Sequence, residues 1–478
     1  MPYHPRLTWA LGHTDRGETQ TSYRIVVQVY KATGYEQLYD SGFVKSNRSQ
    51  NVPLDAPLTP ETLYSWTVQY TDSKGKVSPL SESATFSTGV KDWDGVSWIG
   101  RDVAGCFQAR KDFLTKPIAR ATVYGLGLGY YKLYVDGKKV STHELGAFTT
   151  YSKRVYYDTY DVTAALAVYP GSAHTIAASV GDGWYSQRSV SVGQQTLMIK
   201  LVLLHTDGTT TTIGTDKTWQ VTASPVTQVD IYKGETYDAR LETPLWTTPQ
   251  FSVGSNWTHA SIMAPPSADV KVTSHAILPP IRIVESYTPC DMWESAPGVY
   301  VFDFCQNMAG FTTLRVPEGM ATVPGVAIVQ QHAELIYGPK PAGIHNHYRN
   351  APEINTYYTR GDGAAITHTT MFTYAGFRYV SLKGYPGTPD FSTLTAHFIH
   401  TDYEFTGSVS FSDPLLTEVQ HITRTAAMSN FQSIPTDCPQ RERRGWLGDA
   451  QLSSETNMHN FDMGAPYTSF IQVGWVLW

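Results

Sequence analysis

The chain has 478 residues, too many for one compact hydrophobic core, which predicts about two to four domains. Hydrophobic residues make up 41% and charged residues 16%, as in folded rather than disordered protein. The net charge of -6, with no basic run, argues against nucleic acid or an anionic membrane as a partner. No stretch approaches the roughly 20 apolar residues needed to cross a bilayer.

The N-terminus lacks the apolar core of a signal peptide. The sequence therefore leaves two locations open: the cytoplasm, or secretion after removal of a leader. The cysteines Cys106, Cys290, Cys305 and Cys438 are far apart and include no Cys-x-x-Cys pair. They are too few for a disulfide framework and wrongly spaced for a zinc site, and the sequence leaves their pairing open.

The first part of the chain has the pattern of a small all-β unit. Residues 23–30 and 64–70 are rich in β-branched and aromatic side chains and have the length of strands, and a polar turn follows at 72–75. This pattern predicts a fibronectin type III or immunoglobulin-like β-sandwich over residues 1–92.

Strand patterns continue through the middle of the chain. Tyr131–Val135 leads into Asp136-Gly137, a strong hairpin signal because glycine adopts positive φ without penalty. A second, carbohydrate-binding-like β-sandwich is predicted over 93–275. A third, with strands at 281–284, 299–304 and 379–382, is predicted over 276–404.

From Ser412 onward the apolar residues take helical spacing. Ser412 or Asp413 is placed to cap this helix, and Pro414 is tolerated in its first turn. The apolar positions are Leu415, Leu416, Val419, Ile422, Ala426 and Ala427. A polar loop over 433–448 separates this helix from a second one expected near Asp449, so residues 405–478 are predicted to be helical.

The segment from Asp437 to Asp449 holds three carboxylates, three arginines and a tryptophan within thirteen residues. Glycoside hydrolysis needs a carboxylic acid that protonates the leaving oxygen, and further groups that hold the sugar hydroxyls. Neighbouring carboxylates can keep one member protonated near neutral pH while arginines keep the others ionised. A network of ion pairs that ties a loop to a helix end would have the same composition, so both interpretations stay open.

The run from Ile434 to Glu442, with Gly445-Trp446 and Gly448–Gln451 after it, resembles the signature loop of glycoside hydrolase family 78, the α-L-rhamnosidases. Other stretches resemble the family in the same order along nearly the whole chain: 5–9, 16–25, 97–100, 125–131, 156–163, 302–310 and 372–379. The resemblance implies an inverting hydrolase that releases terminal non-reducing α-L-rhamnose. It also implies a multidomain, mainly β fold, with three β-sandwiches followed by the first helices of an (α/α)6 barrel.

The resemblance also implies roles for individual residues of the loop. Carried over position by position, it makes Glu442 the general acid. The carboxylates expected to grip rhamnose hydroxyls are Asp437 and Asp449, with Arg441 as a sugar or carboxylate ligand and Trp446 as a wall of the subsite.

The chain departs from the family pattern beside the acid and after the loop. Many members have an acidic residue where this chain has Arg443, which allows the acid to be displaced by one position. The family's second carboxylate, a base about 6.5–9.5 Å from the acid, lies far downstream in the barrel, and we expect it to be missing here. Glu455 and Asp462 do not match its position and are expected on helix surfaces. The apolar tail, 470–478, is expected to lack the helices that would bury it.

Other interpretations stay open. The expected absence of the base allows a non-catalytic rhamnose-binding or scaffolding β-sandwich protein descended from such an enzyme. A structural adhesion protein would leave the charged loop unexplained. Cys438 is expected to be a buried thiol of the loop.

We expect no cofactor and no metal. The pairs His332/Glu334 and His345/His347 lack a third ligand with metal spacing. The expected partners are rhamnose-containing glycosides or polysaccharides, and a homo-oligomer is left open.

Overall fold

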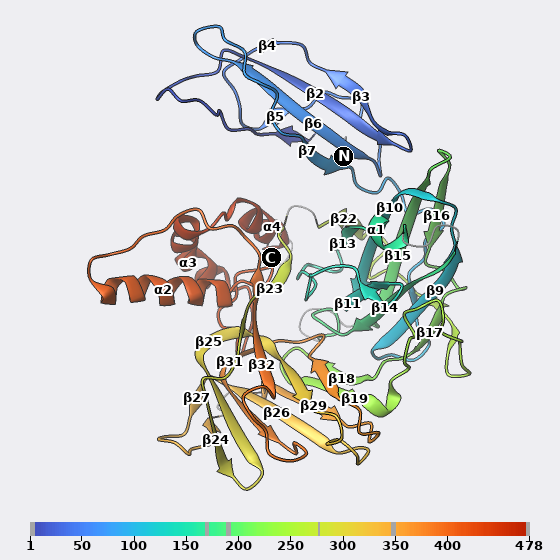
Figure 1. Cartoon of the computed structure of the whole chain (residues 1–478), viewed down its shortest axis with the longest axis vertical. Coiled ribbons are helices and arrows are strands. Elements are labelled where there is room, and N and C mark those ends of the chain that lie inside the picture. Colours follow the sequence, from blue (N-terminus) through green and yellow to red (C-terminus); the bar gives the residue numbers. More distant parts are fainter. Residues whose placement is uncertain (1–4, 168–171, 188–192, 276–277, 346–349, 475–478) are drawn as a thin grey trace.

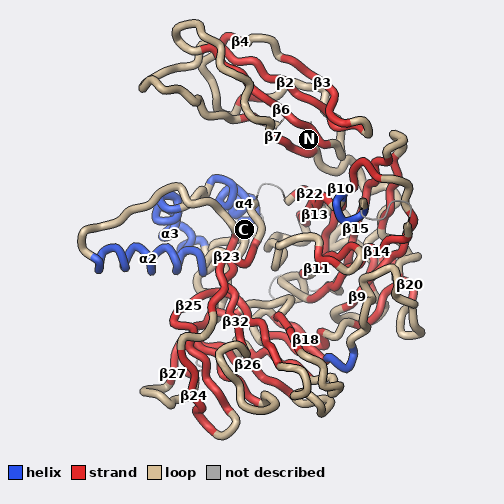
Figure 2. Tube along the Cα trace, viewed as in Figure 1, coloured by secondary structure: helices blue, strands red, loops and turns tan. Residues whose placement is uncertain are grey.

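The computed structural model describes residues 5–167, 172–187, 193–275, 278–345 and 350–474. Strands dominate, and the longer helices gather at the C-terminal end (Figure 2). In Figure 1 the first β unit lies at the top in blue, the second to the right and the third at the bottom, with the helices to the left of centre. The predicted mainly β fold with a helical C-terminal region is confirmed.

The first unit packs a sheet against a short strand pair. The sheet contains β2 (Ser22–Lys31), β3 (Gly34–Asp40), β4 (Val44–Lys45), β6 (Leu63–Thr71) and β7 (Ala84–Ser87), and the facing pair is β1 (Arg6–Leu7) with β5 (Val52–Pro53). Val27 and Tyr64 from the sheet and Val52 from the pair meet in one buried cluster. Strands β2 and β6 confirm the strands predicted at 23–30 and 64–70.

The second unit is a sandwich of two sheets. One contains β8 (Ile99–Gly100), β10 (Ile118–Leu128), β13 (Arg154–Asp161), β15 (Thr196–His205), β16 (Thr210–Gly214), β21 (Ser261–Ile262) and β22 (Lys271–Ser274). The other contains β9 (Phe107–Leu114), β11 (Tyr130–Val135), β12 (Lys138–Lys139), β14 (Ala173–Gly181), β17 (Gln220–Ala223) and β20 (Thr258–His259). Val123 and Leu201 from the first sheet and Ala109 from the second are fully buried in the shared core.

The predicted hairpin at Asp136-Gly137 is present. Asp136 has a φ of 47° and Gly137 a φ of 84°, both positive, and the two residues connect β11 to β12, where Val135 pairs with Lys138. Two short helices, α1 (Thr163–Leu166) and η1 (Ala239–Leu241), interrupt the strands of this part of the chain.

The third unit is built on a long sheet. Its strands are β18 (Val226–Asp230), β19 (Gly234–Asp238), β23 (Ile281–Tyr287), β24 (Asp291–Ala296), β25 (Val299–Val316), β26 (Ala327–Ala333), β29 (Ile354–Tyr358), β30 (Ile366–Thr369), β31 (Ala375–Lys383) and β32 (Leu394–Thr401), with β27 (Leu335–Ile336) and β28 (Ile344–His345) as a separate pair. Strands β18 and β19 join this sheet although they lie within 93–275, because β19 pairs in parallel with β29. The division at 92, 275 and 404 stays a prediction.

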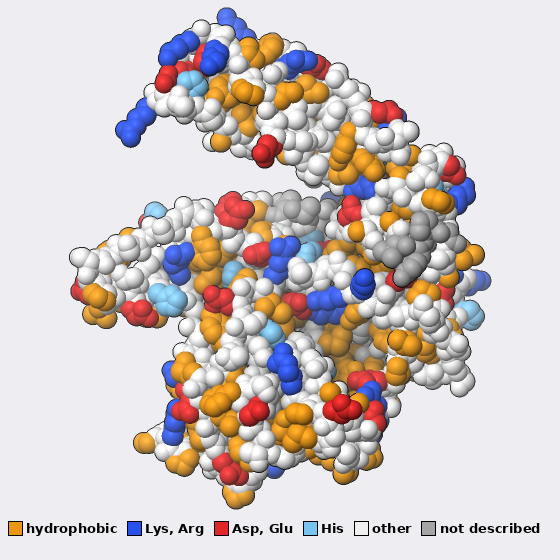
Figure 3. Space-filling view, in the orientation of Figure 1, with side chains coloured by type: hydrophobic (Ala, Val, Ile, Leu, Met, Phe, Trp, Pro, Cys, Tyr) orange, Lys and Arg blue, Asp and Glu red, His pale blue; other side chains and the backbone are white. Residues whose placement is uncertain are grey.

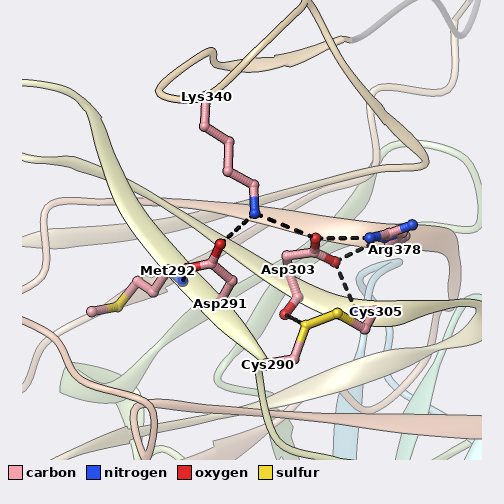
Figure 4. Close-up of a disulfide and its surroundings, with 7 residues drawn as sticks. All are labelled: Cys290, Asp291, Met292, Asp303, Cys305, Lys340 and Arg378. Carbon is pink, nitrogen blue, oxygen red and sulfur yellow. Dashed lines mark hydrogen bonds and ion pairs between the residues drawn. A yellow bond between two sulfur atoms is a disulfide. The ribbon is translucent and has the colours of Figure 1, made fainter.

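A disulfide joins Cys290 to Cys305, fifteen residues apart (Figure 4). Antiparallel pairing of β24 with β25 brings the two cysteines together, and the backbone N–H of Cys290 donates to the carbonyl of Asp303 at 2.8 Å. This pairing was not predicted, because it depends on the β24–β25 hairpin and the spacing of the two cysteines alone does not indicate that hairpin. Cys106 and Cys438 are free thiols.

The helical region consists of α2 (Pro414–Ser429), α3 (Leu447–Asn460) and α4 (Gly464–Gly474). Asp413 caps α2 by accepting from the N–H of Leu415 at 2.9 Å, as predicted. Helix α3 begins at Leu447, slightly before the expected position near Asp449. In the part of the chain that the structure describes, the helices are too short or too polar to span a membrane.

The apolar tail, which was expected to lack helices that bury it, is partly buried in its described part, although Ile471 is 55% exposed. Phe470 is 8% exposed and Val473 is 3% exposed, because α4 packs against a buried cluster that is shared by the second and third units and includes Tyr151. Residues 475–478 lie outside the described residues. By contrast, apolar side chains of α2 are exposed: Leu415 is 69% exposed and Ile422 is 58% exposed.

Candidate active site

The charged segment lies on the connection between α2 and α3, residues 430–446, which we call the candidate loop. Its N-terminal part is fixed to two β units. The N–H of Ser433 donates to Thr401 Oγ1 on β32 at 2.7 Å, and the Ser433 hydroxyl accepts from the N–H of Phe148 in the second unit at 2.9 Å. Because both anchors are buried, the start of the loop is held where the second and third units meet the helices.

The loop closes on itself between Asp437 and Arg444. The N–H of Asp437 donates to the carbonyl of Arg444 at 3.0 Å, and the N–H of Arg444 donates back to Asp437 Oδ1 at 2.9 Å. These reciprocal bonds turn residues 437–444 into a compact loop. The carboxylate of Asp437 is therefore part of the contact that closes the loop.

Glu442 lies within this compact loop, and both of its carboxylate oxygens accept hydrogen bonds. Arg441 Nη2 donates to Oε1 at 2.9 Å, and Trp446 Nε1 donates to Oε2 at 2.9 Å. The Glu442 side chain is 38% exposed, so its carboxylate is within reach of solvent or a ligand. The structure thus brings together three of the residues predicted for the site.

A thiol connects Asp437 to Glu442. Cys438 Sγ donates to Asp437 Oδ2 at 2.9 Å and accepts from the N–H of Glu442 at 3.3 Å. Burial, with a further contribution from Asp437, raises the pKa of the Cys438 thiol, so the protonated thiol is the form that makes these bonds. Cys438 is half-buried rather than fully buried, and it acts as a bridge within the loop.

Trp446 and Asp449 lie at the start of α3. Trp446 occupies the N-cap position and is 51% exposed, which leaves much of its ring available for contact with a ligand. Asp449 is in the first turn of α3, where the helix dipole favours a negative charge, and it is exposed. It follows Trp446 by three residues, but its carboxylate is not part of the hydrogen-bonded group around Glu442 described above.

Arg443 and Arg444 point away from this group, into the protein. Arg443 is fully buried and forms an ion pair with Glu353, which lies just before β29. The guanidinium of Arg444 lies 5.6 Å from the ring centroid of Trp184, and Trp184 in turn packs edge-on against Tyr232. Sequence reasoning missed Glu353, Trp184 and Tyr232 because they are far from the loop in the chain.

The two acidic residues that follow the loop are in surface positions. The Glu455 side chain is 86% exposed, and its carboxylate lies 3.9 Å from His459 on the same face of α3. Asp462 Oδ1 accepts from the N–H of Gly464 at 3.2 Å at the start of α4. Both environments are those of ordinary helix-surface carboxylates.

Groups of potential metal ligands occur elsewhere in the described residues. His13, Glu18 and Asp72 approach one another on the first unit, and Asp303 lies between the two disulfide-bonded cysteines. Neither group is on the candidate loop. His332 is fully buried, its Nδ1 lying 3.0 Å from the carbonyl of Glu353, as in a core histidine, while His347 lies outside the described residues.

Four family models match the chain in consecutive order. They are the Rha78A-like N-terminal immunoglobulin domain at 2–92, the alpha-L-rhamnosidase N-terminal domain at 116–285, the bacterial alpha-L-rhamnosidase concanavalin-like domain at 294–400 and the bacterial alpha-L-rhamnosidase 6 hairpin glycosidase domain at 404–474. Together these models match most of the chain with domains of one family.

Full-length relatives agree with these models. An alpha-L-rhamnosidase of Formosa agariphila is 30% identical over 98% of this chain and 53% of its own length, and one of Streptomyces avermitilis is 34% identical over 74% of this chain and 34% of its own. The structure of the alpha-L-rhamnosidase from Dictyoglumus thermophilum superposes with a TM-score of 0.90 at 34% identity, covering 98% of this chain and 55% of that one.

The chain therefore belongs to the α-L-rhamnosidase family. Nearly all of this chain is matched, but it spans only about half the length of the Formosa agariphila and Dictyoglumus thermophilum relatives.

Proposed function

We propose that this chain carries the acid-bearing part of an α-L-rhamnosidase site, which releases terminal non-reducing α-L-rhamnose from rhamnosides. The observation that supports this most strongly is the group formed by Glu442, Trp446 and Arg441. It places an accessible carboxyl group beside an exposed indole ring, on a loop that family models assign to the glycosidase domain. A carboxylic acid next to a sugar-binding surface is what glycoside hydrolysis requires.

In this proposal Glu442 is the general acid that gives its proton to the glycosidic oxygen as the bond to the aglycone breaks. Proton transfer leaves a carboxylate on Glu442, and the donors from Arg441 and Trp446 stabilise that negative charge through charge-assisted hydrogen bonds. The fixed orientation of these donors keeps the side chain from turning into solvent.

The remaining residues of the site bind the sugar. The exposed ring of Trp446 offers an apolar wall for the C–H face or the methyl group of rhamnose. Asp437 and Asp449 accept hydrogen bonds from sugar hydroxyls, and Arg441 donates to a sugar oxygen. Asp437 already accepts from two donors of its own loop, so its carboxylate is held in place before a sugar arrives.

We further propose an inverting mechanism, in which a second carboxylate activates water about 6.5–9.5 Å from the acid. Glu455 and Asp462 are not assigned this role. Glu455 is on the outer face of α3, and Asp462 is engaged in capping α4. The resemblance to family 78 implies a base far downstream in the (α/α)6 barrel, and no carboxylate of this chain is assigned that role.

The substitution Glu442→Gln, made in a protein in which this chain is followed by the rest of the (α/α)6 barrel, tests the assignment of the acid. The amide keeps the size of the side chain but has no acidic proton, so release of 4-nitrophenol from 4-nitrophenyl α-L-rhamnoside should fall by about 10²–10⁴-fold. The matched control is Glu455→Gln, which changes an exposed carboxylate on α3 and should leave the rate unchanged.

Two results would contradict the proposal. One is hydrolysis by Glu442→Gln within a few-fold of the wild-type rate. The other is a wild-type protein with the complete barrel that binds L-rhamnose in calorimetry but does not hydrolyse the aryl rhamnoside, which is the behaviour of a binding protein.

A further inference from the structure

We propose that Glu353, on the third β unit, is a positioning residue for Glu442: its buried ion pair with Arg443 holds the candidate loop in the conformation that presents the acid. This inference rests on the proposed function, because it concerns the residue assigned there as general acid. Glu353 lies 90 residues before Arg443 in the chain, just ahead of β29. It contacts the acid only through the loop.

The Arg443 guanidinium is enclosed by acceptors and rings. Nε donates to the carbonyl of Pro439 at 2.7 Å, Nη1 donates to the carbonyl of Ile231, and Nη2 donates to Glu353 Oε1. The side chains of Arg443 and Glu353 are 0% and 1% exposed. A buried guanidinium depends on such partners, because water cannot replace them. Glu353 supplies the counter-charge in this set.

The ion pair lies at a contact between the loop and strand β31 of the third unit. The N–H of Gly376 on β31 donates to Glu353 Oε1 at 3.3 Å. A Cβ on Gly376 would come within 2.8 Å of the backbone nitrogen of Gln440, so the loop backbone lies directly on this strand. Glu353 therefore bonds to β31 and to the loop at the same point.

The backbone around the pair adopts a conformation that needs external support. Arg443 has φ of 55° and Glu353 has φ of 51°, a left-handed region that is uncommon for residues with a Cβ. Such conformations persist where surrounding contacts determine them. On the loop side, the contacts of Arg443 with Glu353, Pro439 and Ile231 hold the backbone in this conformation.

Fixing Arg443 fixes the residue before it. The carbonyl of Glu442 accepts from the Tyr232 hydroxyl at 3.1 Å, and its N–H donates to Cys438 Sγ at 3.3 Å. With Arg443 anchored on its other side, the Glu442 backbone is held in one orientation. Its side chain then meets the donors of Arg441 and Trp446.

The charges that face Glu353 support a role for its carboxylate in this contact. Arg443 is its cationic partner, Tyr374 lies under the Arg443 guanidinium at 4.5 Å, and Glu334 is a further acidic neighbour. Burial raises the pKa of Glu353 well above its usual range, while Arg443 opposes this rise. His332, whose pKa is lowered by burial to about 4, is neutral near pH 7 and does not compete with Arg443 for the carboxylate.

The kinetic test uses Glu353→Gln, which preserves shape but removes the charge, in a protein in which this chain is followed by the rest of the (α/α)6 barrel. The control is Glu144→Gln, which alters another largely buried pair, Lys132–Glu144, in the second unit, where the side chains are 6% and 11% exposed. If Glu442 is displaced in Glu353→Gln, kcat should fall by about 10²-fold, while KM for 4-nitrophenyl α-L-rhamnoside stays within about twofold of the wild-type value. The control should change neither constant at temperatures where both variants are folded.

A second measurement does not depend on hydrolysis. Cys438 bridges Asp437 and Glu442, so its alkylation by iodoacetamide reports the loop conformation, and peptide mass spectrometry separates it from Cys106. Release of the loop should speed alkylation of Cys438 by about tenfold in Glu353→Gln, but not in Glu144→Gln.

The two measurements separate the two proposals. Absence of hydrolysis by a wild-type protein with the complete barrel contradicts the proposed function, while the alkylation rates still decide the role of Glu353. Unchanged alkylation of Cys438 in Glu353→Gln overturns the positioning role, as does a loss confined to KM in an active chain. If Glu353→Gln does not fold, Glu353→Asp, which keeps the charge but shortens its reach, is judged by the same criteria.

Discussion

Glu442 and Arg443 are neighbours in the chain, yet their side chains lie in opposite environments. The Glu442 side chain is 38% exposed and faces the Trp446 indole, whereas Arg443 is fully buried against the third unit. Sequence comparison allowed the acid to be displaced by one position, to the place of Arg443. The structure gives Arg443 an anchoring role, which supports Glu442 as the proposed acid.

The buried residue His332 should make the stability of the protein depend on pH. His332 is fully buried, and burial lowers its pKa from 6.5 to about 4. The unfolded chain binds a proton at this residue more readily than the folded one. The contribution of neutral His332 to the free energy of unfolding is therefore fully present above pH 6.5 and is lost as the pH falls toward 4. The loss attributable to this group should be about 3 kcal/mol.

Urea denaturation of wild-type protein and His332→Gln over this pH range measures the effect. The variant should show a shallower fall in the free energy of unfolding, whatever its stability at neutral pH. His459→Gln, whose ring is 78% exposed, is the control and should follow the wild-type curve. Parallel curves for His332→Gln and wild type would contradict the prediction.

At the scale of elements, the β24–β25 hairpin shows how a local irregularity is stabilised. The register of β25 shifts between Asp303 and Met308, and Cys305 within that stretch has φ of 59°. In Figure 4 Asp303 lies beside the disulfide, facing Arg378 and Lys340, and Arg378 Nε donates to Asp303 Oδ1 at 2.8 Å. The disulfide and this buried carboxylate hold the irregular stretch together.

Removing the disulfide should destabilise the third unit. The bond closes a loop with a sequence separation of 15, which corresponds to about 3 kcal/mol of stabilisation in the chain-entropy description. Thermal unfolding with and without dithiothreitol measures this effect in the wild type. The double variant Cys290→Ser/Cys305→Ser should unfold at the lower temperature in both conditions, and a wild type indifferent to reductant would refute the prediction.

At the scale of the whole molecule, the first unit is joined to the rest at one end. Figure 3 shows open space between it and the helical region on the face drawn. Lys200 on β15 reaches across the boundary, pairing with Glu61 at 2.6 Å and donating to the carbonyl of Asp92 at 3.0 Å, and the Tyr30 hydroxyl donates to the carbonyl of Ala119 at 3.2 Å. These contacts fix the orientation of the first unit.

Lys200→Met should loosen this junction. The Lys200 side chain is 7% exposed, so its loss leaves Glu61 without its cation and the connecting segment without a donor. Cleavage by trypsin after Lys91, which is 73% exposed within that segment, should become several-fold faster. Lys116→Met removes a surface pair with Asp207 on the second unit and should leave the cleavage rate unchanged. Equal rates in all three proteins would disprove the junction role.

The sequence by itself predicted the features that depend on residues close together in the chain. Alternating side chains identified β2 and β6, the positive φ of Asp136 and Gly137 produced the expected hairpin, and Asp413 capped α2 as its position indicated. The signature loop likewise pointed to the family, because its residues are consecutive. Each of these features depends on residues within a few positions of one another.

Tertiary structure decided what depends on distant residues. Only the folded chain pairs Cys290 with Cys305, buries Phe470 in a cluster shared by the second and third units and carries β19 into the sheet of the third. The same holds for the ion pair of Glu353 with Arg443, 90 residues apart. Local periodicity carries no information about such contacts, since they form where separate elements pack and their partners are chosen by burial and charge in three dimensions.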